Sequence, residues 1–109
     1  MTVNELVKEL KIEVLALPFP CREIKGVYAG DLLSWVMGRA QEDNVWATIM
    51  TNQNVLAVAS LINTSCVIIC ENSEVDAEII SLADAKEVNL LRTPATIYET
   101  CAALSKLAL

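Results

Sequence analysis

The residues with the greatest capacity to bind a ligand form a run of four hydrogen-bonding side chains, Thr51-Asn52-Gln53-Asn54. A helix cap needs one side-chain oxygen, so four consecutive polar side chains exceed what a cap requires. Such a run at the start of a helix can hold a small anion or a nucleotide through its side chains and the free backbone N–H groups. The simpler alternative is that the run only begins the helix that follows.

Asp31 and Thr93 are two further polar residues that follow predicted strands. In an open parallel sheet, ligands bind in the crevice outside the carboxyl ends of the strands. We therefore expect Asp31 and Thr93 to share one sheet edge with the Thr51–Asn54 run. Helix capping is the alternative for both residues. Asp31 would then begin a helix over Leu32–Ala40, and Thr93 with Pro94 would begin the last helix.

The sequence contains no arrangement that is typical of an enzyme. It has no histidine, the commonest general base and metal ligand, and it has no glycine-rich phosphate loop. Cys21 is the one conceivable nucleophile, because the neighbouring cation of Arg22 favours the thiolate form. We expect neither catalysis nor a cofactor. No Cys-x-x-Cys pair occurs, so we expect free structural thiols and no metal site at the four cysteines, Cys21, Cys66, Cys70 and Cys101.

Composition limits the class of protein further. The chain has 109 residues, of which 54% are hydrophobic, and this suits one folded domain. Fourteen acidic and eight basic residues give a net charge of −6, so we expect no binding to nucleic acid. The polar start of the chain shows no signal peptide, and no apolar run reaches the roughly 18 residues of a membrane span. We expect a cytoplasmic domain that does not contact a membrane.

Predicted strands and helices alternate along the chain, which is the pattern of a parallel sheet with crossover helices. We predict a single α/β domain over residues 1–109, with a mostly parallel sheet flanked by helices on both faces. The predicted strands are Ile12–Leu17, Glu23–Ala29, Val45–Thr51, Cys66–Cys70 and Asn89–Arg92. The predicted helices are Thr2–Leu10 with a Thr2/Glu5 capping box, Leu32–Ala40, one that Thr51–Asn54 caps and that runs to about Asn63, one that a Ser73–Asp76 capping box begins, and one that Thr93-Pro94 begins.

One predicted helix is apolar on nearly every side. Its segment Val55–Ile62 contains one polar residue, Ser60. A helix of this kind is covered on more than one side, and in so small a domain one cover can be a partner. Trp35 and Met37 on the preceding helix are further candidates for interface anchors. We therefore predict a homodimer that uses one of these two helices. The alternative is that all of these side chains are core.

The segment Cys21–Ser34 resembles the DRTGG domain family, in which an Asp-Arg-x-(x)-Thr-Gly-Gly pattern precedes a strand and a Ser/Gly-Asp-Leu-Leu stretch. Cys21 stands where the family has its first Asp, and Arg22 is kept. Lys25 takes the Thr position, and Gly26 keeps one of the two glycines.

Two other stretches carry the resemblance without such changes. Asp31–Ser34 matches the Asp-Leu-Leu part, which adds Ser34 to the candidate ligand-binding residues. Thr51–Ala59 is similar to the family's Thr-x-x-Asn segment and the small apolar helix after it. The resemblance covers nearly the whole chain and implies an α/β domain of unassigned biochemical activity.

Similar domains accompany the kinase domain of HPr kinase, phosphate acetyltransferases and CBS-domain pyrophosphatases, where the family resemblance implies regulatory or assembly-forming roles. Short stand-alone versions are found with anaerobic redox systems such as iron hydrogenases. The resemblance therefore implies a non-catalytic regulatory or ligand-sensing domain, which binds a nucleotide or another small anion. The alternative is an oligomerisation or adaptor domain with no ligand, which joins a protein partner in an anaerobic redox or metabolic regulatory complex.

Overall fold

Five strands form one sheet in the order β1-β5-β4-β3-β2, and the computed structural model describes all residues from 1 to 109. Strands β2 to β5 pair in parallel with their neighbours, whereas β1 runs antiparallel to β5 at the edge of the sheet. The predicted mostly parallel α/β sheet is therefore confirmed. The strands are β1 (Glu13–Ala16), β2 (Val27–Ala29), β3 (Val45–Thr48), β4 (Cys66–Ile69) and β5 (Leu90–Arg92).

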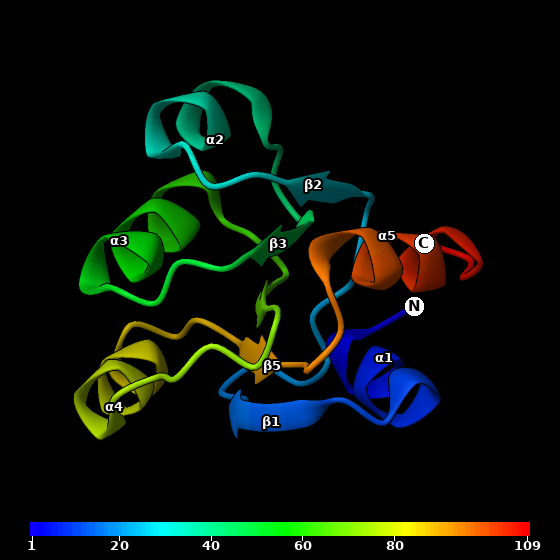
Figure 1. Cartoon of the computed structure of the whole chain (residues 1–109), viewed down its shortest axis with the longest axis horizontal. Helices are drawn as coiled ribbons and strands as arrows, with labels where there is room; N and C mark the ends of the chain where they lie inside the picture. The colour runs from blue at the N-terminus through cyan, green and yellow to red at the C-terminus, as the bar shows by residue number, and fades with distance from the viewer.

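Helices cover both faces of the sheet, as predicted (Figure 1). The chain adds β2, β3, β4 and β5 in one direction, so right-handed crossovers place their three connecting helices on the same face. The first and last helices cover the other face. The longest helix has ten residues, and none is long and apolar enough to cross a bilayer. One layer is α2 (Leu33–Arg39), α3 (Gln53–Ile62) and α4 (Ala77–Ala85), and the other is α1 (Val3–Leu10) and α5 (Ile97–Ser105).

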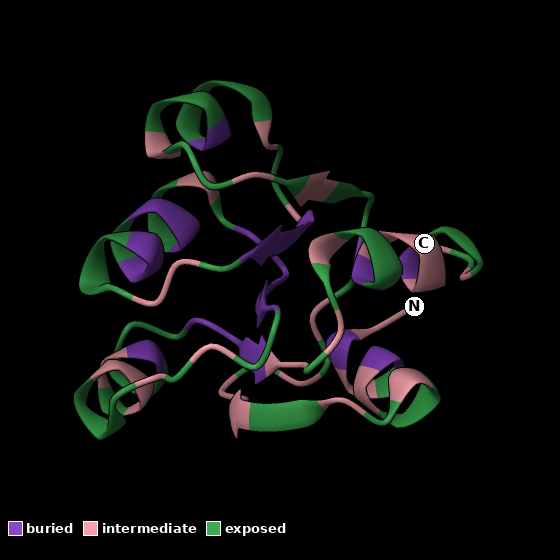
Figure 2. Cartoon of the chain, viewed as in Figure 1, coloured by how far each residue is buried: buried purple, intermediate pink, exposed green.

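The central strand β4 and its neighbour β3 are buried along their whole length (Figure 2). Their side chains alternate between the two faces, as a strand requires. Trp46, Val67 and Ile69 pack with the layer of α2, α3 and α4. Cys66 and Cys70 pack together with the layer of α1 and α5, which confirms that these two thiols share a face.

Capping boxes were predicted at Thr2 and at Ser73, and only the one at Thr2 forms. Thr2 caps α1 in a reciprocal capping box with Glu5, as predicted. The Ser73–Asp76 capping box does not form, so this prediction was wrong. Asp76 is the N-cap of α4 without a side-chain bond, and the Ser73 hydroxyl instead donates to the carbonyl of Cys70.

The prediction that Thr93 caps the last helix was also wrong. The N-cap of α5 is Thr96, whose hydroxyl accepts a hydrogen bond from the backbone of Glu99. Thr93 instead directly follows β5, where its N–H donates to the Ile69 carbonyl at the end of β4 (2.9 Å) and its carbonyl accepts from the N–H of Asn72 in the turn after β4 (2.9 Å). The carbonyl of an N-cap residue accepts the first hydrogen bond of its helix, whereas the carbonyl of Thr93 is used by this turn.

Helix α3 has a buried side and an exposed side. Leu56 is fully buried in the core, so it is excluded as a dimer contact, whereas Leu61 is 72% exposed on the outer side. Trp35 and Met37 on α2 are 52% and 47% exposed. The homodimer stays a prediction, and Leu61, Trp35 and Met37 are the side chains available for it.

Candidate functional site

The carboxyl edge of the parallel strands carries the residues that were predicted to bind a ligand. Asp31 follows β2, the Thr51–Asn54 run follows β3, and Thr93 follows β5 directly. Since β2 and β3 are neighbours, Asp31 lies beside the run. Strand β4 lies between β3 and β5, so Thr93 is displaced from the run by two strand spacings, on the order of 10 Å. The residues thus share an edge without forming one cluster.

Asp31 fixes the loop after β2 against the end of β3. Its Oδ1 accepts a hydrogen bond from the Thr48 hydroxyl (2.6 Å) and from the backbone N–H of Ile49 (3.0 Å). The N-cap of α2 is Leu32, without a side-chain bond, so the prediction that Asp31 caps this helix was wrong. The physical reason is that the buried Thr48 hydroxyl needs a partner, and the Asp31 carboxylate provides it. Sequence reasoning missed Thr48, whose signal is a hydroxyl at the end of an apolar strand.

Capping accounts for one residue of the Thr51–Asn54 run. Asn52 is the N-cap of α3, and its side-chain oxygen accepts from the backbone N–H of Asn54 (2.9 Å). The side chains of Thr51, Gln53 and Asn54 make no hydrogen bond within the chain, and those of Gln53 and Asn54 are exposed. Ser34, in the first turn of α2, is exposed as well. Four polar side chains near this edge are therefore free to contact a ligand.

The electrostatics of this edge are acidic. Burial raises the pKa of the Cys70 thiol, and the nearby carboxylates of Asp31 and Glu71 raise that pKa further. Arg92 at the end of β5 is already paired with Glu13 through hydrogen bonds of 2.9 and 3.2 Å. A bare phosphate would therefore meet carboxylates at this edge. Uncharged groups of a ligand would meet hydroxyls and amides.

Three concave regions mark the surface, and one of them reaches the carboxyl edge. That cavity has a volume of 150 Å³, and its polar lining consists of Thr93, Glu99 and Thr100. Pockets that enclose drug-sized ligands measure roughly 300–1,000 Å³, so this cavity is too small for a nucleotide. Neither Asp31 nor Ser34 nor any residue of the Thr51–Asn54 run lines a cavity. The candidate site is therefore an open surface.

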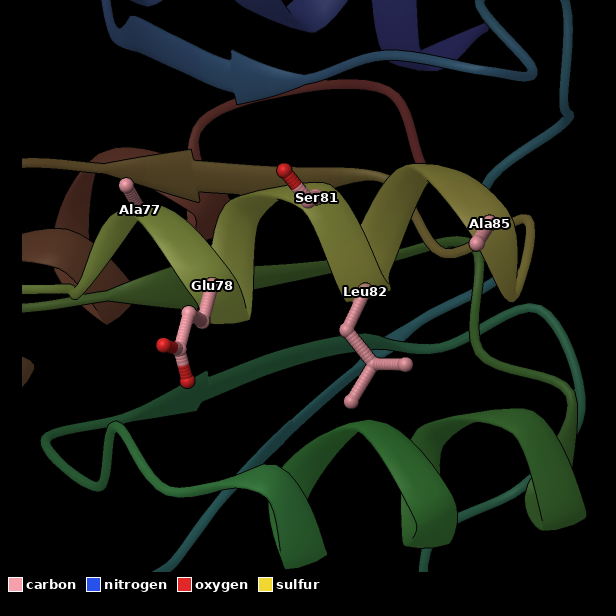
Figure 3. Close-up of a pocket in the computed structure, with 5 residues that line it drawn as sticks. All are labelled: Ala77, Glu78, Ser81, Leu82 and Ala85. Carbon is pink, nitrogen blue, oxygen red and sulfur yellow. The ribbon is translucent and has the colours of Figure 1, made fainter.

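The concave region of largest volume, 470 Å³, is an open and shallow surface along α4 (Figure 3). Glu78 and Leu82 point from this surface toward the side of α4 on which α3 lies. Ala77, Ser81 and Ala85 follow each other at intervals of four residues and are exposed. This surface offers small side chains, the exposed carboxylate of Glu78 and no enclosed volume. All residues that line it belong to α4: Ala77, Glu78, Ser81, Leu82 and Ala85.

Arg22, from the loop that resembles the family pattern, lies at the opposite edge, where the parallel strands begin. Its guanidinium donates to Asp43 Oδ1 from Nε (3.1 Å) and Nη2 (2.8 Å). It also donates to the side-chain oxygen (3.1 Å) and the carbonyl (2.8 Å) of Asn63. Both partners have left-handed backbones, with φ of 66° and 63°. Arg22 therefore clamps three loops together, and sequence reasoning missed both of its partners.

The four cysteines are free and differ in exposure. Cys66 and Cys70 are buried, Cys101 is half-buried and Cys21 is exposed. Burial raises the pKa of the Cys66 thiol to about 12. No group of three side chains of the kinds that ligate metals lies close enough together to hold an ion.

The profile of the DRTGG domain matches residues 32–107, which include α2 to α5. The match starts after the Cys21–Gly26 loop, so it does not test the resemblance of that loop. No curated protein matches the chain.

The fold is similar to a solved structure from Clostridium perfringens. That structure contains the CBS and DRTGG domains of the regulatory region of a pyrophosphatase, complexed with its activator, diadenosine tetraphosphate. The TM-score is 0.71 at 15% sequence identity, over 93% of this chain and 44% of that one. This chain thus spans less than half the length of that neighbour. The profile match over residues 32–107 shows that the chain belongs to the DRTGG domain family.

Proposed function

We propose that this DRTGG domain is a non-catalytic regulatory module that binds a nucleotide, or another small anionic ligand, at the carboxyl edge of its sheet. The observation that carries the proposal is the set of free polar side chains at this edge: Ser34, Thr51, Gln53 and Asn54. Amide side chains both donate and accept hydrogen bonds, which suits the edge of a nucleobase. Asp31 holds the adjoining loop in place, so these side chains stand on a fixed backbone.

Charge determines which part of a nucleotide this edge can hold. The carboxylates of Asp31 and Glu71 disfavour an unscreened phosphate. We therefore assign the base and sugar to the amides of Gln53 and Asn54, with the phosphates directed away from the carboxylates. A divalent cation on the phosphates would reduce the repulsion, so binding is expected to be tighter with Mg²⁺ than in a chelator.

The similar solved structure suggests which compound to use in a binding experiment. Diadenosine tetraphosphate is the activator in the pyrophosphatase complex, and that complex contains CBS domains as well as a DRTGG domain. Diadenosine tetraphosphate is therefore the first compound to test. ATP, which carries one adenosine instead of two, is the comparison. Isothermal titration calorimetry with Mg²⁺ measures both affinities.

The decisive variant removes both free amides, as Gln53→Ala with Asn54→Ala. Each neutral hydrogen bond contributes about 0.5–1.5 kcal/mol, so we expect affinity to fall about 10- to 100-fold. Gln41→Ala is the matched control, because Gln41 is an exposed amide at the opposite end of the strands. The proposal fails if the wild-type protein binds neither compound at millimolar concentration, or if the double variant binds as tightly as the control.

A second candidate function is an oligomerisation or adaptor domain without a ligand. The exposed apolar side chains of Leu32, Trp35 and Met37 on and beside α2, together with Leu61 on α3, favour it. We propose that the protein acts as a homodimer in the cytoplasm, where reducing conditions suit its four free cysteines. A partner in an anaerobic redox or metabolic regulatory complex is part of this second proposal. A stable dimer that binds no nucleotide would favour the adaptor over the sensor.

A further inference from the structure

A second cavity lies at the amino ends of the parallel strands, opposite the proposed nucleotide site. Its volume is 230 Å³, below the roughly 300–1,000 Å³ of pockets for drug-sized ligands, so it suits a smaller molecule. Three segments that are distant in the sequence form its walls. They are the loop before β2, the end of α3 and the end of α4, which supply Phe19, Arg22, Ala59, Ser60, Asn63, Thr64, Lys86, Glu87 and Val88.

Hydrogen bonds within the chain hold the walls of this cavity in place. The backbone N–H of Phe19 donates to Asn89 Oδ1 (2.9 Å), and the carbonyl of Phe19 accepts from Asn89 Nδ2 (2.8 Å). Arg22 joins the same loop to Asn63 at the end of α3. The cavity therefore exists before any ligand arrives, and binding would not have to order these segments.

The hydroxyl of Thr64 lines this cavity and lacks a partner. Thr64 is only 7% exposed, and its hydroxyl makes no hydrogen bond within the chain. Ser65 Oγ is the only unpartnered side-chain oxygen that is closed off from the surface, so the Thr64 hydroxyl still reaches the cavity. Because buried polar groups are normally hydrogen-bonded, this hydroxyl indicates that a polar molecule occupies the cavity.

The charges around the cavity are of both signs. Lys86 and Glu87 are exposed, and neither takes part in an ion pair within the chain. Arg22 is paired, but its hydrogen bonds leave one N–H of Nη1 free. A purely anionic ligand would meet the Glu87 carboxylate, and a purely cationic ligand would meet Lys86 and Arg22. A ligand with one charge of each sign suits both.

Two helices end at this cavity, and their ends favour a positive group inside it. Asn63 is the C-cap of α3, and Lys86 is the C-cap of α4. The C-terminal end of a helix carries partial negative charge, which stabilises an ammonium group. The Glu87 carboxylate adds a full negative charge. The Lys86 ammonium and the free N–H of Arg22 are donors for a carboxylate.

From these observations we infer that this cavity binds the zwitterion of a free α-amino acid with an apolar side chain. The ligand carboxylate contacts Arg22 and Lys86. The ligand ammonium group contacts Glu87 and the Thr64 hydroxyl, which accepts its hydrogen bond.

The apolar part of the lining selects the ligand side chain. Phe19 is 45% exposed, and it lines the cavity together with Ala59 and Val88. The ligand side chain packs on this apolar wall. The inference goes beyond the proposed function, because the cavity takes a different class of ligand at the other end of the strands.

The test is isothermal titration calorimetry of the full chain with L-leucine, whose side chain is apolar and compact. Isocaproate has the same side chain and a carboxylate but no ammonium group, whereas isoamylamine has the ammonium group but no carboxylate. Each should bind at least about 10-fold more weakly than leucine, because one charge-assisted interaction is lost. The inference is refuted if leucine does not bind at millimolar concentration, or if either analogue binds as tightly.

Variants then assign the two charges. Lys86→Gln and Glu87→Gln should each weaken leucine binding by about 10-fold or more. Glu87→Gln should not weaken the binding of isocaproate, a result that a general loss of structure could not give. Lys8→Gln and Glu9→Gln are the matched controls, because both are exposed charges on α1 in the opposite layer. Equal affinity for leucine in Glu87→Gln and Glu9→Gln would contradict the assignment.

A measurement on the unmodified protein keeps the test valid if a variant fails to fold. The amide resonances of Thr64 and Val88 should shift when leucine is added, and that of Asn54 at the carboxyl edge should not. Shifts confined to the carboxyl edge would overturn the inference. The double variant of Gln53 and Asn54 should bind leucine normally, so a failure of the nucleotide proposal is distinguishable from a failure of this one.

Discussion

Replacing Arg22 tests whether the loop that resembles the family pattern is a structural clamp. The side chains of Arg22 and Asp43 are 24% and 18% exposed, and their closest atoms are 2.8 Å apart. Arg22 also makes two hydrogen bonds to Asn63, so Arg22→Ala separates the loop from two others at once. It leaves the Asp43 carboxylate without its main partner.

The magnitude follows from this partial burial. An exposed ion pair contributes about 0–1 kcal/mol, and removal of one partner from a buried pair costs about 3–5 kcal/mol. We expect Arg22→Ala to lower the free energy of unfolding by about 2–3 kcal/mol, within the range for hydrogen bonds to charged groups. For a chain of this size the melting temperature should fall by about 10 °C or more.

Urea denaturation followed by circular dichroism measures the loss. Lys25→Ala is the matched control, because the Lys25 ammonium lies 3.9 Å from the same carboxylate but is 76% exposed. That variant should change the free energy of unfolding by less than about 0.5 kcal/mol. Arg22→Lys should behave like Arg22→Ala, since a single ammonium cannot reproduce the fork that joins Asp43 to Asn63. The clamp is refuted if Arg22→Ala is as stable as the Lys25 control. Unchanged stability together with lost nucleotide binding would instead assign Arg22 to a ligand site.

Three further predictions concern the burial of individual side chains. Leu56→Ala should lower the free energy of unfolding by about 2–5 kcal/mol because Leu56 is fully buried, whereas Leu61→Ala should stay within about 0.5 kcal/mol, measured on the monomer in urea; equal losses would contradict the division of α3 into two sides. The pKa of Cys66 is raised by burial from 9.0 to about 12, so the folded state keeps a proton that the unfolded state loses. Stability should therefore fall between pH 9 and pH 12, and Cys66→Ala should reduce this fall in urea titrations. At neutral pH a thiol reagent should label the exposed Cys21 rapidly and Cys66 only on unfolding, and rapid labelling of Cys66 would show that its burial is wrong.

The central elements were predictable because their signals are local. Strand β4 is an unbroken apolar run in the sequence, because a strand that is covered on both faces has no side chains in contact with water. Helix α1 begins where Thr2 and Glu5 satisfy each other within one turn. The polar run Thr51–Asn54 was likewise correctly placed after a strand end, because it lies two residues beyond a buried strand.

The direction of β1 was not predictable. Its residues alternate in a way that fits either a parallel or an antiparallel neighbour, and the partner β5 lies almost at the other end of the chain. Whether a strand is parallel or antiparallel depends on its partner, so it is known only once the tertiary structure has paired the two strands. The split of α3 into a core side and an outer side has the same origin, since an apolar helix does not reveal which of its sides meets the sheet.

Amino-acid order alone thus determined which segments must be buried and where polar residues interrupt them, because burial follows from the composition of each segment. The tertiary structure decided which partner each polar group takes. Asp31 and Thr93 have the residue types of helix caps. The sheet, however, places the Thr48 hydroxyl beside the Asp31 carboxylate and the Ile69 carbonyl beside the N–H of Thr93. Arg22 finds Asp43 and Asn63 at separations of 21 and 41 residues. A hydrogen bond depends on distances of about 3 Å, and strand order, which no local pattern contains, sets those distances.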